Sequence, residues 1–456
     1  MNKTFIIRIA AVLMMSAALP SVATAQTKSA KRGVCWDENT QSMTDAPLEK
    51  MLPGISWIYN WGVCPARQLT KVGIEGGMDF APMCWTAGFN EKRMRAYIES
   101  HPGVKYLLGF NEPNFMYQAN LTPKDAAALW NKVERIASDY KLKLVAPVLN
   151  FTGDNVGGRA WTPLEWLDEF IGQYRRKHKR LPRIDCLALH CYMNWYGANT
   201  WFATDYFYRD LFDPSNETYG KYPNVVELME DYKTANGNFP RMMLTEFCSW
   251  EGDKDGFKTT PDSQMDQMTQ KVQKHEQSDL VEGYAWFIAN GNARVTPYFS
   301  IFKTNWSDSE LSDLGQVYVH MSSFDREKFY GPGDRIQVKD YVDATTDDVQ
   351  VRLRPNTEEG SDLPLQVEFR NGSSADYQIT VPQDGTYRFA LHCLSPSGAK
   401  LGISVDGKDL TEIAIAATGP QWQDCEGSIA LTGGKHSVRL SNTGTSFFIA
   451  NSWSFN

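Results

Sequence analysis

The segment Tyr106-Leu107-Leu108-Gly109-Phe110-Asn111-Glu112-Pro113-Asn114 decides the fold expected for this chain. Its apolar first half is typical of a buried strand, and Pro113 ends that strand directly after an Asn-Glu pair. A second run, Met242-Met243-Leu244-Thr245-Glu246-Phe247-Cys248, brings another glutamate to a strand end in the same way. We therefore expect two carboxylates at the ends of two buried strands that lie far apart in the sequence.

Short apolar runs alternate with amphipathic helical patterns from residue 31 to about residue 330. Two helices have clear starts, because Thr122-Pro123 and Thr162-Pro163 each supply a capping hydroxyl, a proline at the first helical position and an acid soon after. Strands are expected at 32–36, 56–61, 78–85, 105–111, 143–149, 185–191, 241–247 and 282–287. This alternation predicts an α/β fold, a (β/α)8 TIM barrel over residues 31–328.

The pattern changes after the Gly- and Pro-containing segment 329–334, which we expect to be a linker. Strand-like runs at 365–369, 377–381, 386–391, 402–405 and 436–440 follow without helical stretches between them. Turn pairs such as Asp384-Gly385 separate these runs. Residues 335–456 are therefore expected to form a β-sandwich of the jelly-roll type.

The first 25 residues have the features of a signal peptide. Lys3 and Arg8 precede an apolar run, and Ala23-Thr24-Ala25 supplies the small residues of a cleavage site. We expect a secreted or periplasmic protein without a membrane span, since no other run reaches the length that a bilayer requires. Cleavage removes two positive charges and no acid, so the net charge falls from −8 to −10, which argues against nucleic acid as a partner.

The cysteines and histidines show no metal-binding pattern. Neither CxxC nor HExxH occurs, so we expect no metal and no cofactor. All eight cysteines follow the signal peptide, where disulfides are possible. Cys393 and Cys425 could pair with each other, while the other six allow 15 pairings or are buried thiols.

The two glutamates suit hydrolysis of a glycosidic bond by double displacement. In a barrel, Glu112 and Glu246 end strands four and seven and face the same open end. We expect Glu112 to be the general acid/base and Glu246 to be a nucleophile kept ionised by hydrogen bonds. Asn111 is expected to hydrogen-bond the sugar hydroxyl next to the anomeric carbon. The 14 Trp and 20 Tyr residues suit sugar stacking, although a large core also uses such rings.

Three segments give a specific resemblance. Gly109-Phe110-Asn111-Glu112-Pro113-Asn114, Ser56-Trp57-Ile58-Tyr59-Asn60-Trp61 and Leu244-Thr245-Glu246-Phe247 resemble the signatures of glycoside hydrolase family 128, the glycosyl hydrolase catalytic core group. The resemblance covers residues 31–325 and implies action on β-1,3-glucan. It also implies subsites lined by strand-end side chains, namely Tyr59, Trp61, Trp85, His190, Tyr192 and Trp286. Trp195 and Trp201, in the long loop after the sixth strand, are expected to face solvent and to add distant subsites. For each ring, core packing is the alternative, and for His190 it is a hydrogen bond to a carbonyl.

The C-terminal region resembles carbohydrate-binding modules of family 6. The resemblance rests on segments 374–382, 385–387, 422–423 and 434–436. Three positions depart from that pattern: Ser374 or Ala375 replaces a tryptophan, Lys339 replaces an acidic calcium ligand, and Ile449 or Ala450 replaces an asparagine. A lysine repels calcium, so the sandwich is better supported than its binding of glycan or calcium.

These observations lead to one preferred function and two alternatives. We expect a monomeric, secreted, retaining endo-β-1,3-glucanase whose partner is a β-glucan. A relative acting on another β-glycan is one alternative. The other is a glycan-binding protein that has lost catalysis, which the presence of Asn111, Glu112 and Glu246 disfavours.

Overall fold

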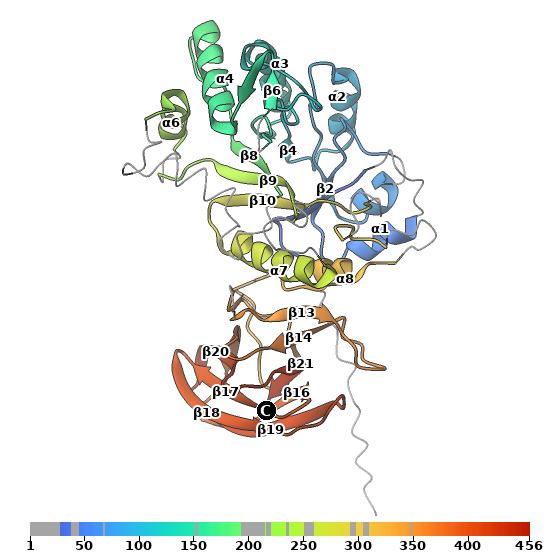
Figure 1. Cartoon of the computed structure of the whole chain (residues 1–456), viewed down its shortest axis with the longest axis vertical. Coiled ribbons are helices and arrows are strands. Elements are labelled where there is room, and N and C mark those ends of the chain that lie inside the picture. Colours follow the sequence, from blue (N-terminus) through green and yellow to red (C-terminus); the bar gives the residue numbers. More distant parts are fainter. Residues whose placement is uncertain are drawn as a thin grey trace, which may run out of the picture.

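The computed structural model describes residues 28–37, 45–66, 69–150, 154–192, 215, 220–233, 237–249, 260–291, 298–303, 310–346 and 349–456. The expected signal peptide lies outside these residues. A mixed α/β part is followed by an all-β part, and the two are stacked along the long axis of the molecule (Figure 1). No described helix has the length and apolar character needed to cross a membrane.

The α/β part contains every strand predicted from the sequence. These strands are β1 (Arg32–Cys35), β2 (Trp57–Tyr59), β3 (Asp79–Phe80), β4 (Tyr106–Leu107), β5 (Lys143–Leu144), β8 (Cys186–Cys191), β9 (Arg241–Phe247) and β10 (Val281–Trp286). One parallel sheet has the order β3-β2-β1-β10-β9-β8, and β4 and β5 form a separate parallel pair. Isolated parallel bridges continue the pairing on both sides: Met83 with Leu108 joins the segments that follow β3 and β4, and Val145 with Cys186 joins the segment after β5 to β8. A hairpin of β6 (Asp154–Val156) and β7 (Arg159–Trp161) was not predicted.

Helices lie around these strands (Figure 1). They are α1 (Asp45–Met51), the π-helix η1 (Leu69–Ile74), α2 (Glu91–Ser100), α3 (Pro123–Asp139), α4 (Pro163–His178), α6 (Pro223–Asp231), α7 (Pro261–Gln277) and α8 (Asp313–His320). The two predicted helix starts are confirmed. Thr122 caps α3 by accepting from the Asp125 amide, and Thr162 and Glu165 form a reciprocal capping box on α4.

Alternating strand residues divide the core into two layers. One face of the strands forms a small inner cluster that includes Cys35, Tyr59, Ala188, Met243 and Ala285. The other face packs against the helices in a much larger cluster. Because side chains alternate along a strand, the inward set also determines which strand-end residues reach the site.

One irregularity in β9 breaks this alternation. Leu244 pairs with Leu189 of β8, but the next pair is Glu246 with His190, so Thr245 is an extra residue. The pairing of β9 with β10 shifts over the same stretch. A bulge of this kind redirects the following side chain. Simple alternation would put Glu246 on the helix-facing side with Met242 and Leu244, whereas the bulge turns it toward His190.

The C-terminal part consists of two antiparallel sheets. Its strands are β11 (Ile336–Gln337), β12 (Asp343–Ala344), β13 (Arg352–Pro355), β14 (Leu365–Phe369), β15 (Ser374–Val381), β16 (Gly385–Leu394), β17 (Ala399–Val405), β18 (Lys408–Ile415), β19 (Gln423–Leu431), β20 (Gly434–Asn442) and β21 (Phe448–Phe455). One sheet has the order β13-β14-β21-β16-β19 with β11 beside β21, and the other has the order β12-β15-β20-β17-β18. The expected linker is itself bound to these sheets, since the Tyr330 amide donates to Gln378 and Tyr330 accepts from the Thr380 amide.

The two parts make direct contact through α7. Asp266 forms ion pairs with Arg354 at 2.8 Å and Arg352 at 3.2 Å, both on β13. Gln273 donates to the Asp343 carboxylate at 2.9 Å and to the Ala344 carbonyl at 2.6 Å. Figure 1 shows α7 and α8 lying against this edge of the C-terminal part. Helix α7 follows strand β9, which carries Glu246, so the C-terminal part supports the element next to that residue.

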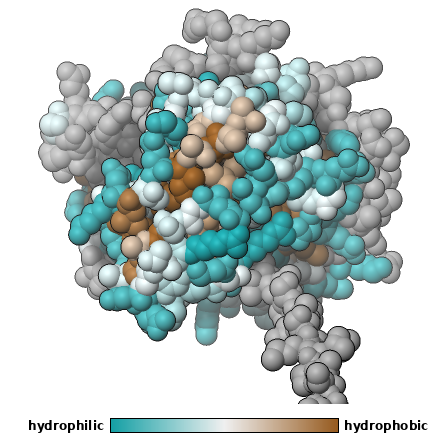
Figure 2. Space-filling model, turned by 90° about the horizontal axis from the view of Figure 1, so that it is seen from below, coloured by the Kyte–Doolittle hydropathy of each residue, from teal (hydrophilic) through white to brown (hydrophobic). Residues whose placement is uncertain are grey.

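The far end of the C-terminal part has a mixed surface. Seen from that end, it is largely hydrophilic, with a band of apolar residues across it (Figure 2). Strand β18 lies at this end in Figure 1 and carries Leu410, which is 40% exposed. None of the eight cysteines forms a disulfide in the structure, including Cys393 on β16 and Cys425 on β19. Lys339 is buried and paired with Asp340.

Candidate active site

Glu112 directly follows the strand segment that begins with β4. Its backbone φ is 41°, an unusual value for a residue other than glycine, and its amide donates to the Val148 carbonyl at 2.7 Å. Such backbone conformations occur often at functional sites, where the surrounding structure maintains them. The carboxylate is buried and accepts a hydrogen bond from Nδ2 of Asn150 at 2.8 Å. Glu112 is therefore held in one orientation by its neighbours on the following strand.

Glu246 is held by three donors. Its Oε1 accepts from Trp61 Nε1 at 2.7 Å and from the Tyr59 hydroxyl at 3.1 Å. Its Oε2 accepts from the Tyr192 hydroxyl. Trp61 also has a positive φ, 59°, at the end of the segment that contains β2. These contacts fix the orientation of the carboxylate.

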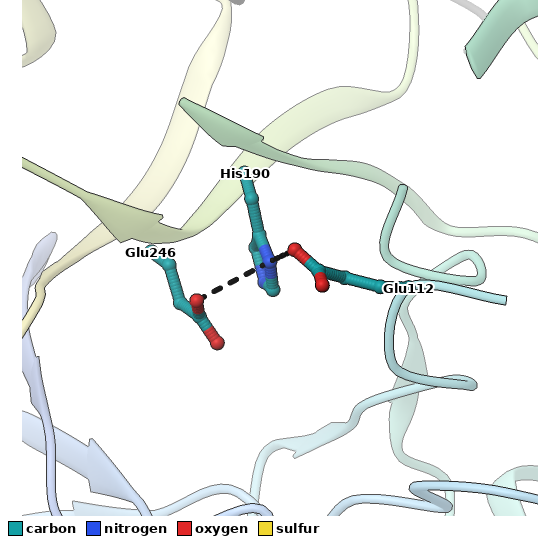
Figure 3. Close-up of side chains that lie close together, drawn as sticks. All are labelled: Glu112, His190 and Glu246. Atoms are coloured by element: carbon teal, nitrogen blue, oxygen red, sulfur yellow. Dashed lines mark hydrogen bonds and ion pairs between the residues drawn. The ribbon is translucent and has the colours of Figure 1, made fainter. Parts of the chain in front are cut away.

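His190 lies between the two glutamates. Its Nδ1 is 2.7 Å from Glu112 Oε1 and 3.3 Å from Glu246 Oε2, and its Nε2 is 3.0 Å from the Thr245 hydroxyl. Figure 3 shows the imidazole between carboxylates that approach it from opposite sides. One oxygen of each glutamate and one nitrogen of His190 lie within 4.8 Å of one another. His190 is 0% exposed, so it acts on the glutamates and not on a ligand.

The charges in this group depend on one another. Burial raises the pKa of Glu246, and the charge of Glu112 adds to the rise, while His190 and the hydrogen bonds from Tyr192 and Trp61 oppose it. These opposing contacts offset burial only in part, so the net pKa of Glu246 stays above its ordinary value. Burial lowers the pKa of His190, but the charge of Glu246 and the contact with Glu112 overcome this effect, and the net pKa is raised. The protonation states of Glu246 and His190 therefore depend on each other.

The same three side chains are close enough to hold a metal ion. However, both nitrogens of His190 already face hydrogen-bond partners, and Trp61 and Tyr59 donate to Glu246. A cation would have to displace these donors. The donor set therefore fits a protonated network better than a metal centre.

Asn111 and Trp85 lie beside Glu112. The Asn111 amide donates to the Trp85 carbonyl at 2.9 Å, and the Asn111 side chain donates to Gln118 at 3.2 Å. The buried Oδ1 of Asn111 has no hydrogen-bond partner in the structure, so an acceptor remains for a ligand hydroxyl. Trp85, Trp61 and Tyr192 are partly exposed, as sugar-contacting rings must be.

Three predicted subsite residues have other positions. Trp286 is fully buried among the helix-facing residues, where its Nε1 donates to the Phe299 carbonyl at 2.7 Å. The expectation that it lines a subsite is wrong, because its place on β10 directs it away from the site. Tyr59 and His190 are also fully buried and contact the glutamates, so neither forms a wall for sugar. Trp195 and Trp201 lie outside the described residues.

The sequence interpretation missed Phe287, Asn150 and Thr245. The Phe287 ring packs edge-on at 5.5 Å from Tyr192 and at 6.1 Å from Trp61. It follows the outward-facing Trp286, so strand alternation could have identified it. Asn150 comes directly after predicted strand 143–149, and the strand-end rule applied to Glu112 would have found it. Thr245 comes two residues after the inward-facing Met243, so strand alternation could also have identified it.

A hollow of about 380 Å³ lies in the C-terminal part. Its lining includes Glu358, His392 and Asp424, and His392 contacts both carboxylates. The Trp422 ring stacks on His392 at 5.5 Å. Asn451 of β21 donates to Glu358 at 2.6 Å. It directly follows Ile449 and Ala450, the positions at which the resemblance to family 6 modules led us to expect an asparagine.

The chain is similar to a known protein family and to solved structures. Residues 33–208 and 217–318 match the glycosyl hydrolase catalytic core family. A solved endo-β-1,3-glucanase of glycoside hydrolase family 128, subgroup II, from Pseudomonas viridiflava is 33% identical, with a TM-score of 0.50 over 64% of this chain and 98% of that one. A subgroup II endo-β-1,3-glucanase from Sorangium cellulosum is 26% identical, with a TM-score of 0.49 over 63% of this chain and 97% of that one. No curated protein matches the chain.

Proposed function

The chain belongs to the glycosyl hydrolase catalytic core family, and on this basis we propose that it is a retaining endo-β-1,3-glucanase. The observation that carries the proposal is the pair Glu112 and Glu246, with one carboxylate oxygen of each within 4.8 Å of the other. Retaining glycosidases have carboxyl groups about 5–5.5 Å apart, whereas inverting ones leave room for water at about 6.5–9.5 Å. The short separation supports the retaining mechanism.

In the first step, Glu246 attacks the anomeric carbon while Glu112 donates a proton to the departing glycosidic oxygen. In the second step, Glu112 takes a proton from water, and the water oxygen displaces Glu246 from the sugar. The hydrogen bonds from Trp61 and Tyr59 aim Glu246, and the one from Asn150 aims Glu112. The free acceptor of Asn111 is suited to the hydroxyl beside the reacting carbon.

His190 controls where the proton resides. The network has two states with the same number of protons. In one, His190 is protonated and lies between two carboxylates; in the other, His190 is neutral and Glu112 is protonated. Transfer between them needs only a shift along the 2.7 Å contact from Nδ1 to Glu112 Oε1. The buried network can thus protonate Glu112 from His190 without taking up another proton from solvent.

The substrate assignment rests on the Pseudomonas viridiflava endo-β-1,3-glucanase, which is 33% identical over nearly all of its own length. Trp61, Tyr192 and Phe287 supply rings beside Glu246, and Trp85 packs against the same inner cluster. Such rings suit the CH faces of glucose units. We assign no nucleic-acid partner and expect a monomer.

We also propose that the α/β part, residues 31–328, is a closed (β/α)8 barrel and that residues 335–456 form a jelly roll related to carbohydrate-binding modules. The bridges on both sides of the β4–β5 pair support closure. The hollow beside Trp422 and Asn451 supports a role in glycan binding. Residues 1–25 are proposed to direct export, and the N-terminal sequence of the mature protein tests this assignment.

The test is hydrolysis of linear and branched β-1,3-glucans, β-1,4-glucan and mixed-linkage glucan, with products followed by chromatography and by NMR of the first-formed anomer. We expect β-configured oligosaccharides from β-1,3-glucan, with the matched variant Glu246→Gln inactive. Release from another glycan only would assign a different substrate. Retention on a glucan affinity gel without hydrolysis would indicate a binding protein.

A further inference from the structure

The turn after Glu112 exposes apolar side chains that the proposed catalytic step does not use. Tyr117 is 75% exposed and Met116 is 43% exposed. The Phe115 ring meets Tyr117 edge-on, with the ring centroids 5.8 Å apart. An exposed aromatic pair next to a catalytic carboxylate is a typical sugar-stacking surface, because one ring face remains open to a ligand.

Several hydrogen bonds hold this turn in place. The Phe115 amide donates to the Glu112 carbonyl at 3.0 Å, and the Gln118 amide donates to the Phe115 carbonyl at 3.2 Å. Asn114 is fully buried and exchanges two hydrogen bonds of 2.9 Å with the backbone of Asn150. Asn150 in turn donates to Glu112. One network therefore positions both the acid/base and the exposed rings.

The unpredicted hairpin supports the same turn. Asp154, the first residue of β6, accepts a hydrogen bond from the Met116 amide at 3.3 Å. The hairpin thus gives the exposed turn a second point of attachment. The rings are presented by a fixed backbone, which reduces the ordering cost of binding a ligand.

The side of the site follows from the chemistry of the two glutamates. Glu246 bonds to the sugar that stays, whereas Glu112 protonates the oxygen of the part that leaves. In Figure 3 the backbone that carries Glu112 lies on the far side of its carboxylate from Glu246. The rings of Trp61, Tyr192 and Phe287 gather instead around Glu246.

We propose that Phe115, Met116 and Tyr117 form a binding surface for the leaving-group half of the glucan chain. This inference rests on the proposed function and deepens it. The surface holds the departing oligosaccharide against Glu112, and it receives an acceptor sugar when the glycosyl-enzyme reacts with a sugar in place of water.

The test compares two substrates that share the retained sugars. One is a β-1,3-linked oligosaccharide, and the other is an aryl glycoside whose leaving group contains no sugar. Tyr117→Ala should reduce the ratio of kcat/KM for the oligosaccharide to kcat/KM for the aryl glycoside by roughly threefold to tenfold, the range of one stacking contact. Transfer to added sugar acceptors should fall in parallel. Phe447→Ala, which truncates a 38% exposed ring in the C-terminal part, is the matched control and should leave the ratio unchanged.

Two failures are distinguishable. If the wild-type protein cleaves both substrates and Tyr117→Ala leaves the ratio and the transfer unchanged, the inference is overturned and the proposed function stands. If the wild-type protein cleaves neither substrate, the proposed function is overturned, and the inference falls with it.

Discussion

Replacing His190 by phenylalanine tests the proton network at its centre. The ring has similar size and is fully buried, so the change removes both nitrogens with little loss of packing. Glu112 then loses its 2.7 Å contact, and Thr245 loses its 3.0 Å contact. The donors from Asn150 to Glu112 and from Trp61 and Tyr59 to Glu246 remain.

The expected loss of activity follows from the contact with Glu112. A hydrogen bond to a charged group contributes about 1.5–3 kcal/mol. If this stabilisation acts in the transition state, kcat/KM falls by roughly 10-fold to 150-fold. His190→Asn is the companion variant, because its amide can replace the Nδ1 donor but cannot carry a charge. It should lose less activity than His190→Phe.

The pH profile separates the proton from the geometry. The pKa of His190 is raised by Glu246 and Glu112 in spite of burial, so the network keeps its last proton to a higher pH than it would without the histidine. Both variants should therefore move the alkaline limb of kcat/KM to lower pH. The assay is hydrolysis of a β-1,3-linked oligosaccharide across pH, with circular dichroism to check folding.

Two results would contradict this account. A His190→Phe enzyme with kcat/KM within about twofold of wild type and an unmoved alkaline limb would show that His190 only fills space. An unmoved limb in His190→Asn combined with a large rate loss would show that the ring positions Glu112 but stores no proton.

Four further predictions follow from the same structure. Glu246→Ala should abolish turnover and yield a product of inverted configuration with azide, which NMR checks. Glu112→Ala should still cleave aryl glycosides with good leaving groups, because these need little protonation. Rates on polysaccharide and on aryl glycoside check this, and a wild-type rate of Glu112→Ala on polysaccharide would refute it. Glu246→Gln should raise the melting temperature at neutral pH but not below about pH 4, because burial raises the pKa of Glu246 and penalises only its ionised form. Asp266→Ala should lower the free energy of unfolding by about 1–3 kcal/mol, because its partner Arg354 is only 18% exposed. The control Glu426→Ala breaks an exposed pair with Arg388 and should change the free energy of unfolding by less than about 0.5 kcal/mol. Equal effects of the two variants in denaturant titrations would contradict this prediction. Neither chelator nor added calcium should change activity or melting temperature, since His190 has partners at both nitrogens and Lys339 pairs with Asp340; a shift with either would reveal a metal site.

The sequence by itself determined the order of elements and the location of Glu112 and Glu246 at the ends of two strand segments. Apolar runs ended by Pro113 or by polar residues specify buried strands, and the threonine-proline pairs specify where α3 and α4 begin. These signals are local, because propensity, capping and alternation act over a few residues. Because these signals are local, the sequence also correctly predicted the change to an all-β pattern after residue 334.

Other features depend on contacts between distant segments. Alternation alone would turn Glu246 toward the helices, and only the pairing of β9 with both β8 and β10 creates the bulge that redirects it. Trp286 and Phe287 are neighbours of similar character, and which of them faces the site depends on strand register. The contact between α7 and β13 joins residues far apart in the chain. The local sequence determines which side chains lie at the end of a strand. The direction in which each of these side chains points depends on strand register, which is a property of the assembled sheet.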